Sequence, residues 1–561
     1  MNRLKLFILA GILPVTTCLQ AQNPKWYKKA RKAQISIVTY NEQGDILRSG
    51  NGFFITKNGV ALANYKLFEG ASKAVVVDSE GRKFNVAHIQ GANSLYDVVK
   101  FDLGKDVKTN TLEIAEDSAR TGSAVYVMPY PTQEKNRCRV DTVRKVVAFD
   151  ENRYVYYTLG NASNDKNTNC PIMNHDGQVV GMLQAPANTE DPNSYAISIG
   201  YGRDLEIGGL SFADSDLQGI HIQKALPVSE DMATTFIYMA NQEDSASYTS
   251  YLKEYIEAYP KSPTGYTLLA EYNALRGNYQ EAESVYEKAL KQTERKDEIY
   301  FSQSRLFYNL NLNPKYQVYK DWTMQQAFVM AESAGKENNL PIYLQQQGHC
   351  LYALKEYQKA YEKYMALAQT NLRSAETFVY AAQCKRMLEA PLEDILALQD
   401  SALSCYSKPY AIEAAALLID RANTLVALKR YRQAVNDYNE YERLMLGKLT
   451  ANFYYQKSQC ELQSRMYQQA LDDIDRAASM EPNTALFQAE KAVICYKVGM
   501  LVEAIEAAQK CISIDPDFAD AYRILGICFV QNNQKEDGLK QLQKAVDLGD
   551  KIAPKLIEEI K

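Results

Sequence analysis

The feature that most constrains the fold of this chain is a pair of small residues, twelve positions apart, that recurs over residues 270–538. The pairs are Ala270 and Ala282, Gly348 and Ala360, Ala422 and Ala434, Ser458 and Ala470, Ala492 and Ala504, and Gly526 and Gly538. Prolines and tyrosines accompany them, at Pro260, Pro482, Pro516, Tyr286, Tyr364 and Tyr438. Small residues at this spacing let two helices approach closely, so the pattern predicts helical hairpins that stack on one another.

This pattern resembles the tetratricopeptide repeat, a helix–turn–helix unit of 34 residues. Pro482 and Pro516 are 34 residues apart. Residues 230–262 resemble a leading unit, and 297–340 and 375–414 resemble degenerate or lengthened ones. The resemblance implies an all-α solenoid of about eight or nine units over 230–550. Residues 216–229 are then a linker, and residues 551–561 a C-terminal capping helix.

Upstream of the linker, hydrophobic residues follow a period of two, which is typical of β-strands. We expect strands at Gln34–Tyr40, Gly52–Ile55, Ala74–Val77, Asn85–Gln90, Val98–Asp102, Ala124–Met128, Thr142–Phe149, Tyr154–Leu159, Val179–Leu183 and Tyr195–Ser198. Many short strands bounded by Gly, Asn or Asp turns predict an all-β sandwich or barrel over residues 25–215.

Several runs in this region are similar to HtrA-like trypsin-fold serine proteases. Residues 49–62 resemble the family's G-S-G-F-x-I-x-x-x-G-x-I-L run, and 94–101 resemble its segment with the catalytic aspartate. Residues 161–182 resemble the nucleophile loop and the strand that follows it. The resemblance covers residues 30–210 and implies a double β-barrel.

The same alignment places altered residues at the catalytic positions. Lys66 stands at the histidine position, Asp97 at the aspartate and Thr168 at the serine. Lys66 cannot act as an imidazole, and the β-branched Thr168 has a restricted hydroxyl in a loop that lacks the family's glycines. We therefore expect a degenerate triad with no catalytic residues. With Asp97 retained, we expect the Lys66 ammonium to form an ion pair with it.

Other nucleophile or base candidates have simpler interpretations. His88, His175 and His221 are interpreted as ordinary surface or packing residues. Cys170 lies one residue before Pro171, whereas the nucleophile precedes that proline by three. A Ser–Lys type of hydrolase remains the competing interpretation, in which Lys66 would serve as general base.

Residues 1–21 predict a bacterial secretory signal peptide, with a basic start, an apolar run over residues 6–15 and a cleavage site after Ala21. The alternative is a lipoprotein anchored at Cys18, for which Thr17 is a poor preceding residue. The mature protein is expected in the periplasm, in the cell envelope or outside the cell. Membrane association is expected only if Cys18 is lipidated.

The composition narrows the possible ligands. The net charge is −5 and no basic block is present, which argues against a nucleic-acid partner. The chain has four histidines and no C-x-x-C pair, so no metal site is expected, and no cofactor motif is found. Most cysteines lie in helical sequence as packing residues, whereas the redox state of Cys138 and Cys170 is left open.

Two functions from different classes follow. The first is a secreted adaptor or scaffold that binds a protein or peptide on the concave face of the repeat superhelix, with an inactive trypsin-like domain. The second is an active serine-type endopeptidase whose repeats recruit substrates. A purely structural repeat protein with a vestigial barrel is a third interpretation.

Overall fold

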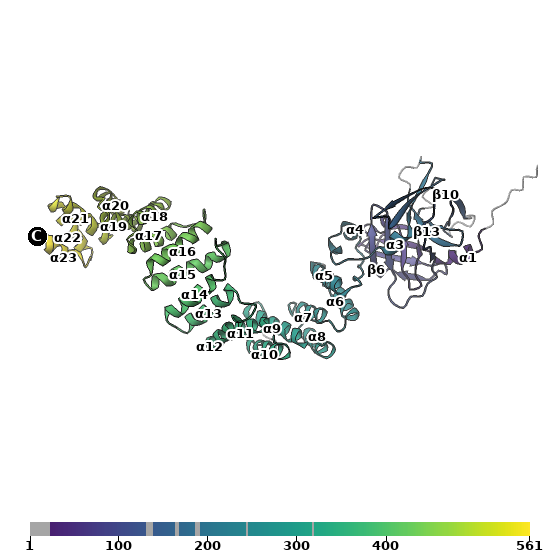
Figure 1. Cartoon of the computed structure of the whole chain (residues 1–561), viewed down its shortest axis with the longest axis horizontal. Helices are drawn as coiled ribbons and strands as arrows, with labels where there is room; N and C mark the ends of the chain where they lie inside the picture. Colours follow the sequence, from purple (N-terminus) through teal and green to yellow (C-terminus); the bar gives the residue numbers. More distant parts are fainter. Residues whose placement is uncertain are drawn as a thin grey trace, which may run out of the picture. The chain divides into compact units, whose positions relative to one another are not determined.

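The computed structural model describes residues 23–560 except for 131–137, 163–167, 186–190, 243–244 and 317–318. The chain forms two compact units. The first extends to Val285 and includes Lys291–Thr293, and the second contains Tyr286–Leu290 and the chain from Glu294 onward. Strands fill the purple-to-blue part of the chain and helices the teal-to-yellow part (Figure 1).

The first unit contains two β-sheets. The strands of the first sheet are β1 (Gln34–Tyr40), β2 (Ile46–Phe54), β3 (Ala61–Ala63), β4 (Lys73–Val77), β5 (Lys83–Asn85), β6 (His88–Asn93) and β7 (Val98–Asp102). Those of the second sheet are β8 (Glu113–Ile114), β9 (Ala124–Val127), β10 (Arg139–Phe149), β11 (Tyr154–Leu159), β12 (Pro171–Met173), β13 (Gln178–Leu183) and β14 (Ser194–Ser198).

The two sheets differ in closure. The first runs β5-β4-β1-β2-β3-β7-β6 and stays open, with β6 at one edge. The second runs β12-β9-β10-β11-β14-β13-β8, and the pairing of β12 with β13 closes six of its strands into a barrel. The expected trypsin-like double barrel is therefore confirmed, as one closed barrel and one half-barrel.

Two hydrophobic clusters hold the sheets together. One lies between the sheets and joins Phe53, Leu62 and Val98 of the first to Met173 and Ile197 of the second. The other fills the closed barrel with residues of β9, β11, β12, β13 and β14. Buried residues alternate with partly buried ones along most of β1, as expected for a strand with one face on the core.

Each of the ten predicted strands overlaps an observed one, but three short strands were not predicted. The predicted strand Asn85–Gln90 is in fact the end of β5 and the start of β6. The missed strands β3, β8 and β12 have two or three residues each, too few to display an alternating pattern.

Short helices accompany the sheets: α1 (Tyr27–Ala30), η1 (Arg31–Ala33), α2 (Tyr65–Phe68), α3 (Ile199–Asp204), η2 (Ser211–Ala213) and α4 (Ser215–Gln218). The first long helices are α5 (Glu230–Met239), α6 (Ser245–Ala258), α7 (Pro263–Ala274) and α8 (Tyr279–Gln292), with η3 (Ala240–Gln242) after α5. The boundary between the two units falls within α8.

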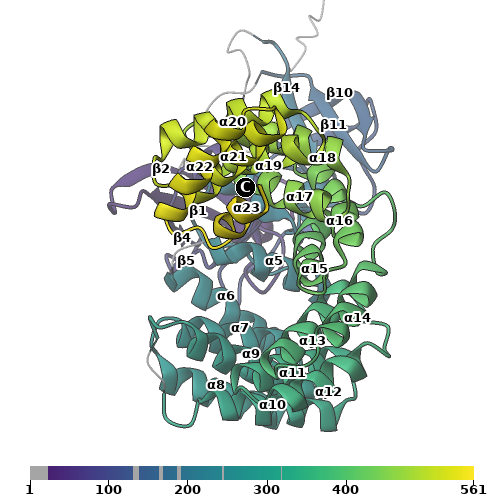
Figure 2. The same ribbon diagram turned by 90° about the vertical axis from the view of Figure 1, so that its left-hand side faces the viewer.

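The second unit is helical throughout its described residues. Its helices are α9 (Lys296–Leu312), α10 (Met324–Glu337), α11 (Pro341–Ala353), α12 (Tyr357–Leu367), α13 (Ala375–Met387), α14 (Leu392–Leu403), α15 (Ala415–Ala427), α16 (Tyr431–Leu444), α17 (Ala451–Gln463), α18 (Tyr467–Met480), α19 (Ala485–Lys497), α20 (Leu501–Ile514), α21 (Ala519–Gln531), α22 (Lys535–Asp547) and α23 (Ala553–Ile560), with η4 (Ile412–Ala414) before α15. From α9 to α22, helices pack in consecutive antiparallel pairs along a curved path (Figure 2).

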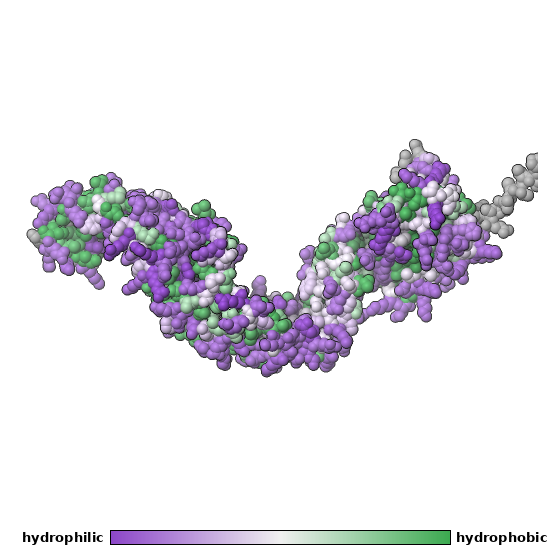
Figure 3. Space-filling view, viewed as in Figure 1, coloured by the Kyte–Doolittle hydropathy of each residue, from purple (hydrophilic) through white to green (hydrophobic). Residues whose placement is uncertain are grey.

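The small residues lie where the two helices of a pair approach each other. A Cβ added to Gly526 would lie 2.8 Å from the carbonyl oxygen of Gly538, and one added to Gly538 would lie 2.7 Å from that of Gly526. Ala422 and Ala434 are fully buried in the same way. The predicted all-α repeat solenoid is therefore confirmed. Its outer surface is mostly hydrophilic, with hydrophobic residues showing between the polar ones (Figure 3).

Candidate functional site

The residue at the histidine position, Lys66, is the second residue of the one-turn helix α2, and its side chain is exposed. Its backbone N–H donates a hydrogen bond to Oδ1 of Asp97 at 3.0 Å. Among the described residues, the Lys66 ammonium has no ion-pair partner. The predicted Lys66–Asp97 ion pair is therefore wrong. A free N–H at the start of the helix meets the carboxylate, while the ammonium stays in water.

Asp97 occupies a constrained position. It is 8% exposed, its φ is 46°, and its Oδ2 has no hydrogen-bond partner within the described part of the chain. Asp and Asn tolerate left-handed backbone better than other non-glycine residues. Asp97 thus serves the first turn of α2 as an acceptor.

The residue at the serine position, Thr168, directly precedes the loop residue Asn169 and strand β12. Thr168 is half-buried, and its hydroxyl oxygen has no hydrogen-bond partner in the part of the chain described. In this conformation, no described group is therefore placed to take the proton of Thr168. The resemblance to the protease family implies an oxyanion hole formed by the backbone N–H groups of Lys166 and Thr168, and Lys166 lies outside the described residues.

Asparagine side chains join the two sheets beside Thr168. The Nδ2 of Asn169 donates to Oδ1 of Asn64 at 2.6 Å and to the carbonyl oxygen of Asn51 at 3.4 Å. The hydroxyl of Tyr130 donates to the carbonyl oxygen of Asn169 at 2.7 Å. Asn169 has a φ of 66° and is 4% exposed. Sequence reasoning missed this network, although Asn51 and Asn64 lie in and just after a run that resembles the protease family.

Cys170 is not an activated nucleophile. It is fully buried, and this burial raises the pKa of its thiol to about 12. Burial likewise raises the pKa of the Cys138 thiol to about 12. Both cysteines are free in the structure. Because the thiolate is the reactive form, neither thiol is poised for chemistry at neutral pH.

A cavity of about 650 Å³ lies away from the triad positions. It is bounded by Glu42 and Ser72 of the first sheet's loops, by His221 and Lys224, by apolar residues of η2 and α5, and by Gln242 of η3. Lys66, Asp97 and Thr168 do not line it.

Within the described residues, no group of three His, Cys, Asp or Glu side chains is arranged to hold a metal ion. No helix in that part of the chain is long and apolar enough to cross a membrane.

The first helices of successive hairpins contact one another in the second unit. Gln459 of α17 donates to Glu490 of α19 at 3.0 Å, and Gln531 of α21 donates to the hydroxyl of Tyr496 at 2.8 Å. Arg386 of α13 bonds Asp420 of α15 at 2.9 Å. Polar side chains therefore link the first helices of neighbouring hairpins at three places along the second unit.

Comparisons with known proteins agree with this division. Residues 50–182 match the family model of the trypsin-like peptidase domain, and residues 246–296 match that of the tetratricopeptide repeat. This chain joins a trypsin-like peptidase domain to tetratricopeptide repeats. The trypsin-like match contains Lys66, Asp97 and Thr168, and the repeat match spans α7, α8 and all but the first residue of α6.

Individual proteins resemble parts of the chain. The TPR repeat-containing protein MJ1428 of Methanocaldococcus jannaschii is 25% identical over 202 residues, which cover 36% of this chain and 30% of that protein. The serine endoprotease from Yersinia pestis is 17% identical with a TM-score of 0.27, covering 32% of this chain and 65% of its own. YrrB, described as a TPR protein with an unusual peptide-binding site, is 22% identical with a TM-score of 0.30. The match covers 36% of this chain and 99% of the YrrB chain.

Proposed function

We propose that this protein is a secreted bacterial adaptor or scaffold, which binds proteins or peptides through its tetratricopeptide repeats and does not hydrolyse them. The observation that carries the proposal is that no group in the described part of the chain is placed to take the proton of Thr168. The Lys66 ammonium is exposed, Asp97 is engaged by a backbone N–H, and the Thr168 hydroxyl has no partner in the described chain. Nucleophilic catalysis requires a base within hydrogen-bond reach of the hydroxyl.

The competing function is an active serine-type endopeptidase whose repeats recruit substrates. Thr168 keeps a hydroxyl, and that hydroxyl is not engaged elsewhere in the described structure, which is the observation in favour of hydrolysis. Activation would require a general base to move within hydrogen-bond reach of this hydroxyl.

Hydrolysis is tested on the purified chain with an unfolded protein substrate and, separately, with a fluorophosphonate probe. We expect neither cleavage nor labelling above the level of a Thr168→Ala variant. Cleavage by the parent chain that disappears in Thr168→Ala would establish the endopeptidase and end the adaptor proposal for this domain.

The binding surface is proposed to be the layer of first helices. Repeat arrays build extended concave surfaces. The links between α13 and α15, α17 and α19, and α19 and α21 support the placement of neighbouring first helices side by side here. Asn423 of α15 and Asn436 of α16 offer a matched test, because both are exposed asparagines of one hairpin. A photo-crosslinking residue at 423 is expected to capture partners in an envelope extract, and the same residue at 436 is not. Equal capture at both positions would remove the first-helix layer from the proposal.

Secretion is proposed from the composition of residues 1–21. The N-terminus of the protein recovered from cells is expected to begin at Gln22 and to be found in the envelope or medium. Retention of residues 1–21 on a cytoplasmic product would contradict it. A lipid adduct at Cys18, absent from Cys18→Ala, would instead establish the anchored form.

A further inference from the structure

The helices adjoining the barrel are fastened to the open edge of its first sheet. Residues 216–229, the expected linker, contain the end of α4 and a segment that runs beside edge strand β6. The N–H of Ile89 donates to the carbonyl oxygen of Gln223 at 2.8 Å, and the N–H of Ala225 donates to that of Ile89 at 2.8 Å. An edge strand that would otherwise present unpaired backbone groups is thereby covered.

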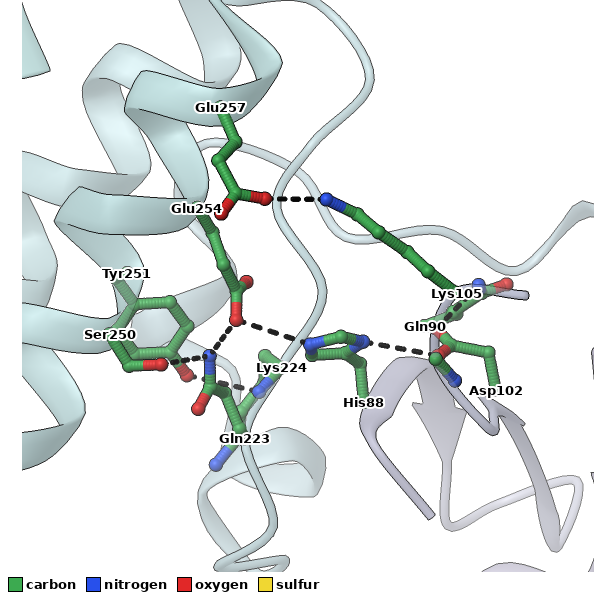
Figure 4. A network of polar contacts seen from close by, with 11 residues as sticks. His88, Gln90, Asp102, Lys105, Gln223, Lys224, Ser250, Tyr251, Glu254 and Glu257 are labelled. Carbon is green, nitrogen blue, oxygen red and sulfur yellow. Dashed lines mark hydrogen bonds and ion pairs between the residues drawn. The ribbon is translucent and has the colours of Figure 1, made fainter. Parts of the chain in front are cut away.

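His88 connects this edge to helix α6. Its Nδ1 lies 3.1 Å from Oδ1 of Asp102, at the end of β7, and its Nε2 lies 3.3 Å from Oε1 of Glu254 in α6 (Figure 4). The His88 side chain is 25% exposed, Asp102 12% and Glu254 31%. Both ring nitrogens therefore face carboxylates, which only accept hydrogen bonds. The doubly protonated imidazolium satisfies both contacts, whereas either neutral tautomer would turn a lone pair toward a carboxylate.

The electrostatic balance agrees with this geometry. Burial by itself would lower the pKa of His88, but the hydrogen bonds to Asp102 and Glu254 outweigh it and raise the pKa to about 10. Burial would raise the pKa of Asp102, but His88, the Gly104 N–H and Gln90 together lower it. The imidazolium and the Asp102 carboxylate are thus both charged at neutral pH.

Surrounding contacts orient the two carboxylates. Gln90 donates to Oδ2 of Asp102 at 2.8 Å, and Gln223 donates to Oε1 of Glu254 at 2.6 Å. The N–H of Lys224 donates to the hydroxyl of Tyr251 at 3.0 Å.

The other charged groups near the imidazolium are engaged as well. The ammonium of Lys105 pairs with Glu257 at 2.5 Å at the surface. The ammonium of Lys224 donates to the carbonyl oxygen of Ile220 at 2.6 Å.

An aromatic cluster completes the attachment. The ring centroids of Phe212 and Phe236 are 4.5 Å apart, and those of Phe236 and Tyr251 are 5.3 Å apart. These residues belong to η2, α5 and α6, and Phe236 is fully buried. Apolar packing thus supplies the contact area, and the charged contacts fix the angle at which α6 meets the sheet.

We propose that the trypsin-like domain serves as the fixed base of the repeat array, with His88 as an ionic bridge that locks the hairpin α5–α6 to the β6–β7 edge. We call this junction the joint and define it by His88, Ile89, Asp102, Gln223, Lys224 and Glu254. The barrel then caps the first apolar helix face of the array, a cap that stacked repeats require for stability. This role goes beyond the proposed function and does not depend on whether Thr168 is catalytic.

Hydrogen exchange on the whole chain tests the joint. His88→Gln is expected to speed amide exchange in peptides from residues 86–93, 220–226 and 248–258 on the order of tenfold, because charged hydrogen bonds are lost there. His175→Gln is the matched control, since His175 is a barrel histidine whose side chain is 89% exposed. It is expected to leave exchange in those peptides unchanged. Unchanged exchange in His88→Gln, or an equal effect in His175→Gln, would overturn the bridge.

Two further measurements separate a loosened joint from a destabilised barrel. Glu254→Gln changes only the helix side, so it is expected to speed exchange at 86–93 and 220–226 while β9–β14 stay protected. NMR of labelled histidine rings in the whole chain is expected to show His88 still protonated at pH 8, and less so in Glu254→Gln. A neutral His88 ring at pH 8, or unaltered exchange in Glu254→Gln, would contradict the proposal.

Discussion

Asp97 and Lys66 meet through the backbone and not through their charges. The Lys66 N–H is the donor, and the ammonium has no ion-pair partner in the described chain. Asp97 at the aspartate position of the triad is therefore no sign of catalysis in itself, because its carboxylate already has a structural role at the start of α2.

Substitutions at these two positions should separate the charge from the backbone contact. Lys66→Met is expected to change the free energy of unfolding by less than about 0.5 kcal/mol, as for an exposed residue without partners. Asp97→Asn keeps an acceptor and tolerates the left-handed backbone, whereas Asp97→Ala does neither and is expected to cost about 1–3 kcal/mol. Urea denaturation of the three variants decides this. A large loss in the free energy of unfolding of Lys66→Met would show that the ammonium does form a stabilising ion pair.

A second residue-scale feature is a buried charge cluster in the repeats. The Nζ of Lys457 lies 2.6 Å from a carboxylate oxygen of Glu442, 2.9 Å from one of Asp473 and 3.9 Å from one of Glu461. Glu461 is 1% exposed. Its burial and the nearby charge of Asp473 raise the pKa of Glu461 to about 8. At pH values between the ordinary pKa of a glutamate and about 8, Glu461 is therefore protonated in the folded state and ionised in the unfolded state.

The repeats should accordingly lose stability as the pH rises from about 5 to about 8. The folded state holds more protons than the unfolded state in this window, so the free energy of unfolding falls with pH. Glu461→Gln removes the titration and is expected to be more stable than the parent by about 1–3 kcal/mol at pH 8.5, with little difference at pH 5. Thermal unfolding at both pH values measures the difference. A variant that is less stable at pH 8.5 would show that the charged carboxylate is favourable.

At the scale of elements, the sequence predicted the features that a local pattern carries. Small residues twelve apart place two helices in contact, and Gly526 and Gly538 do lie against each other's carbonyl oxygens. Strands with several alternating residues were found, whereas β12, with three residues that begin at Pro171, carries no period. The Lys66 error arose because alignment gives a position but not the direction of a side chain. The joint escaped prediction because His88 and Glu254 are 166 residues apart.

The helix contact in the last repeat can be tested at Gly538. An added methyl group would lie 2.7 Å from the Gly526 carbonyl oxygen and 2.5 Å from a methyl of Val530. Gly538→Ala gains helix propensity, but overpacking against backbone is expected to outweigh the gain and to destabilise the repeats by about 1–2 kcal/mol. Gly335→Ala in α10 is the control, because its methyl group would meet only the end of the Gln347 side chain, at 3.0 Å. The expected result is a lower melting temperature for Gly538→Ala only, and equal melting of both variants would contradict it.

At the scale of the whole molecule, the boundary between the two compact units falls within the repeats, at α8, and not between the barrel and the first long helices. The joint lies inside the first compact unit, which contains the barrel together with α5, α6 and α7. A cut near residue 220 would remove Gln223 and Glu254 from the barrel and uncover the edge of β6. Experiments that divide the protein should therefore keep residues up to 258 with the barrel.

Limited proteolysis with trypsin offers a direct test of this organisation. A flexible linker is a preferred cleavage site, because a protease needs a stretch of chain that can leave the surface. Lys224 lies in residues 216–229, but its N–H and its ammonium both donate hydrogen bonds within the first unit. Lys448 is exposed in the turn between α16 and α17, and neither lysine is followed by proline. Cleavage after Lys224 is expected to be at least about tenfold slower than after Lys448, since the joint must open first.

The same digestion of His88→Gln completes the comparison, with fragments assigned by mass spectrometry. Loss of the ionic bridge is expected to raise the rate of cleavage after Lys224 and to leave the rate after Lys448 unchanged, because Lys448 lies far along the chain in the second unit. If Lys224 in the parent chain were cut as rapidly as Lys448, residues 216–229 would be a free tether and the barrel would not act as a fixed base.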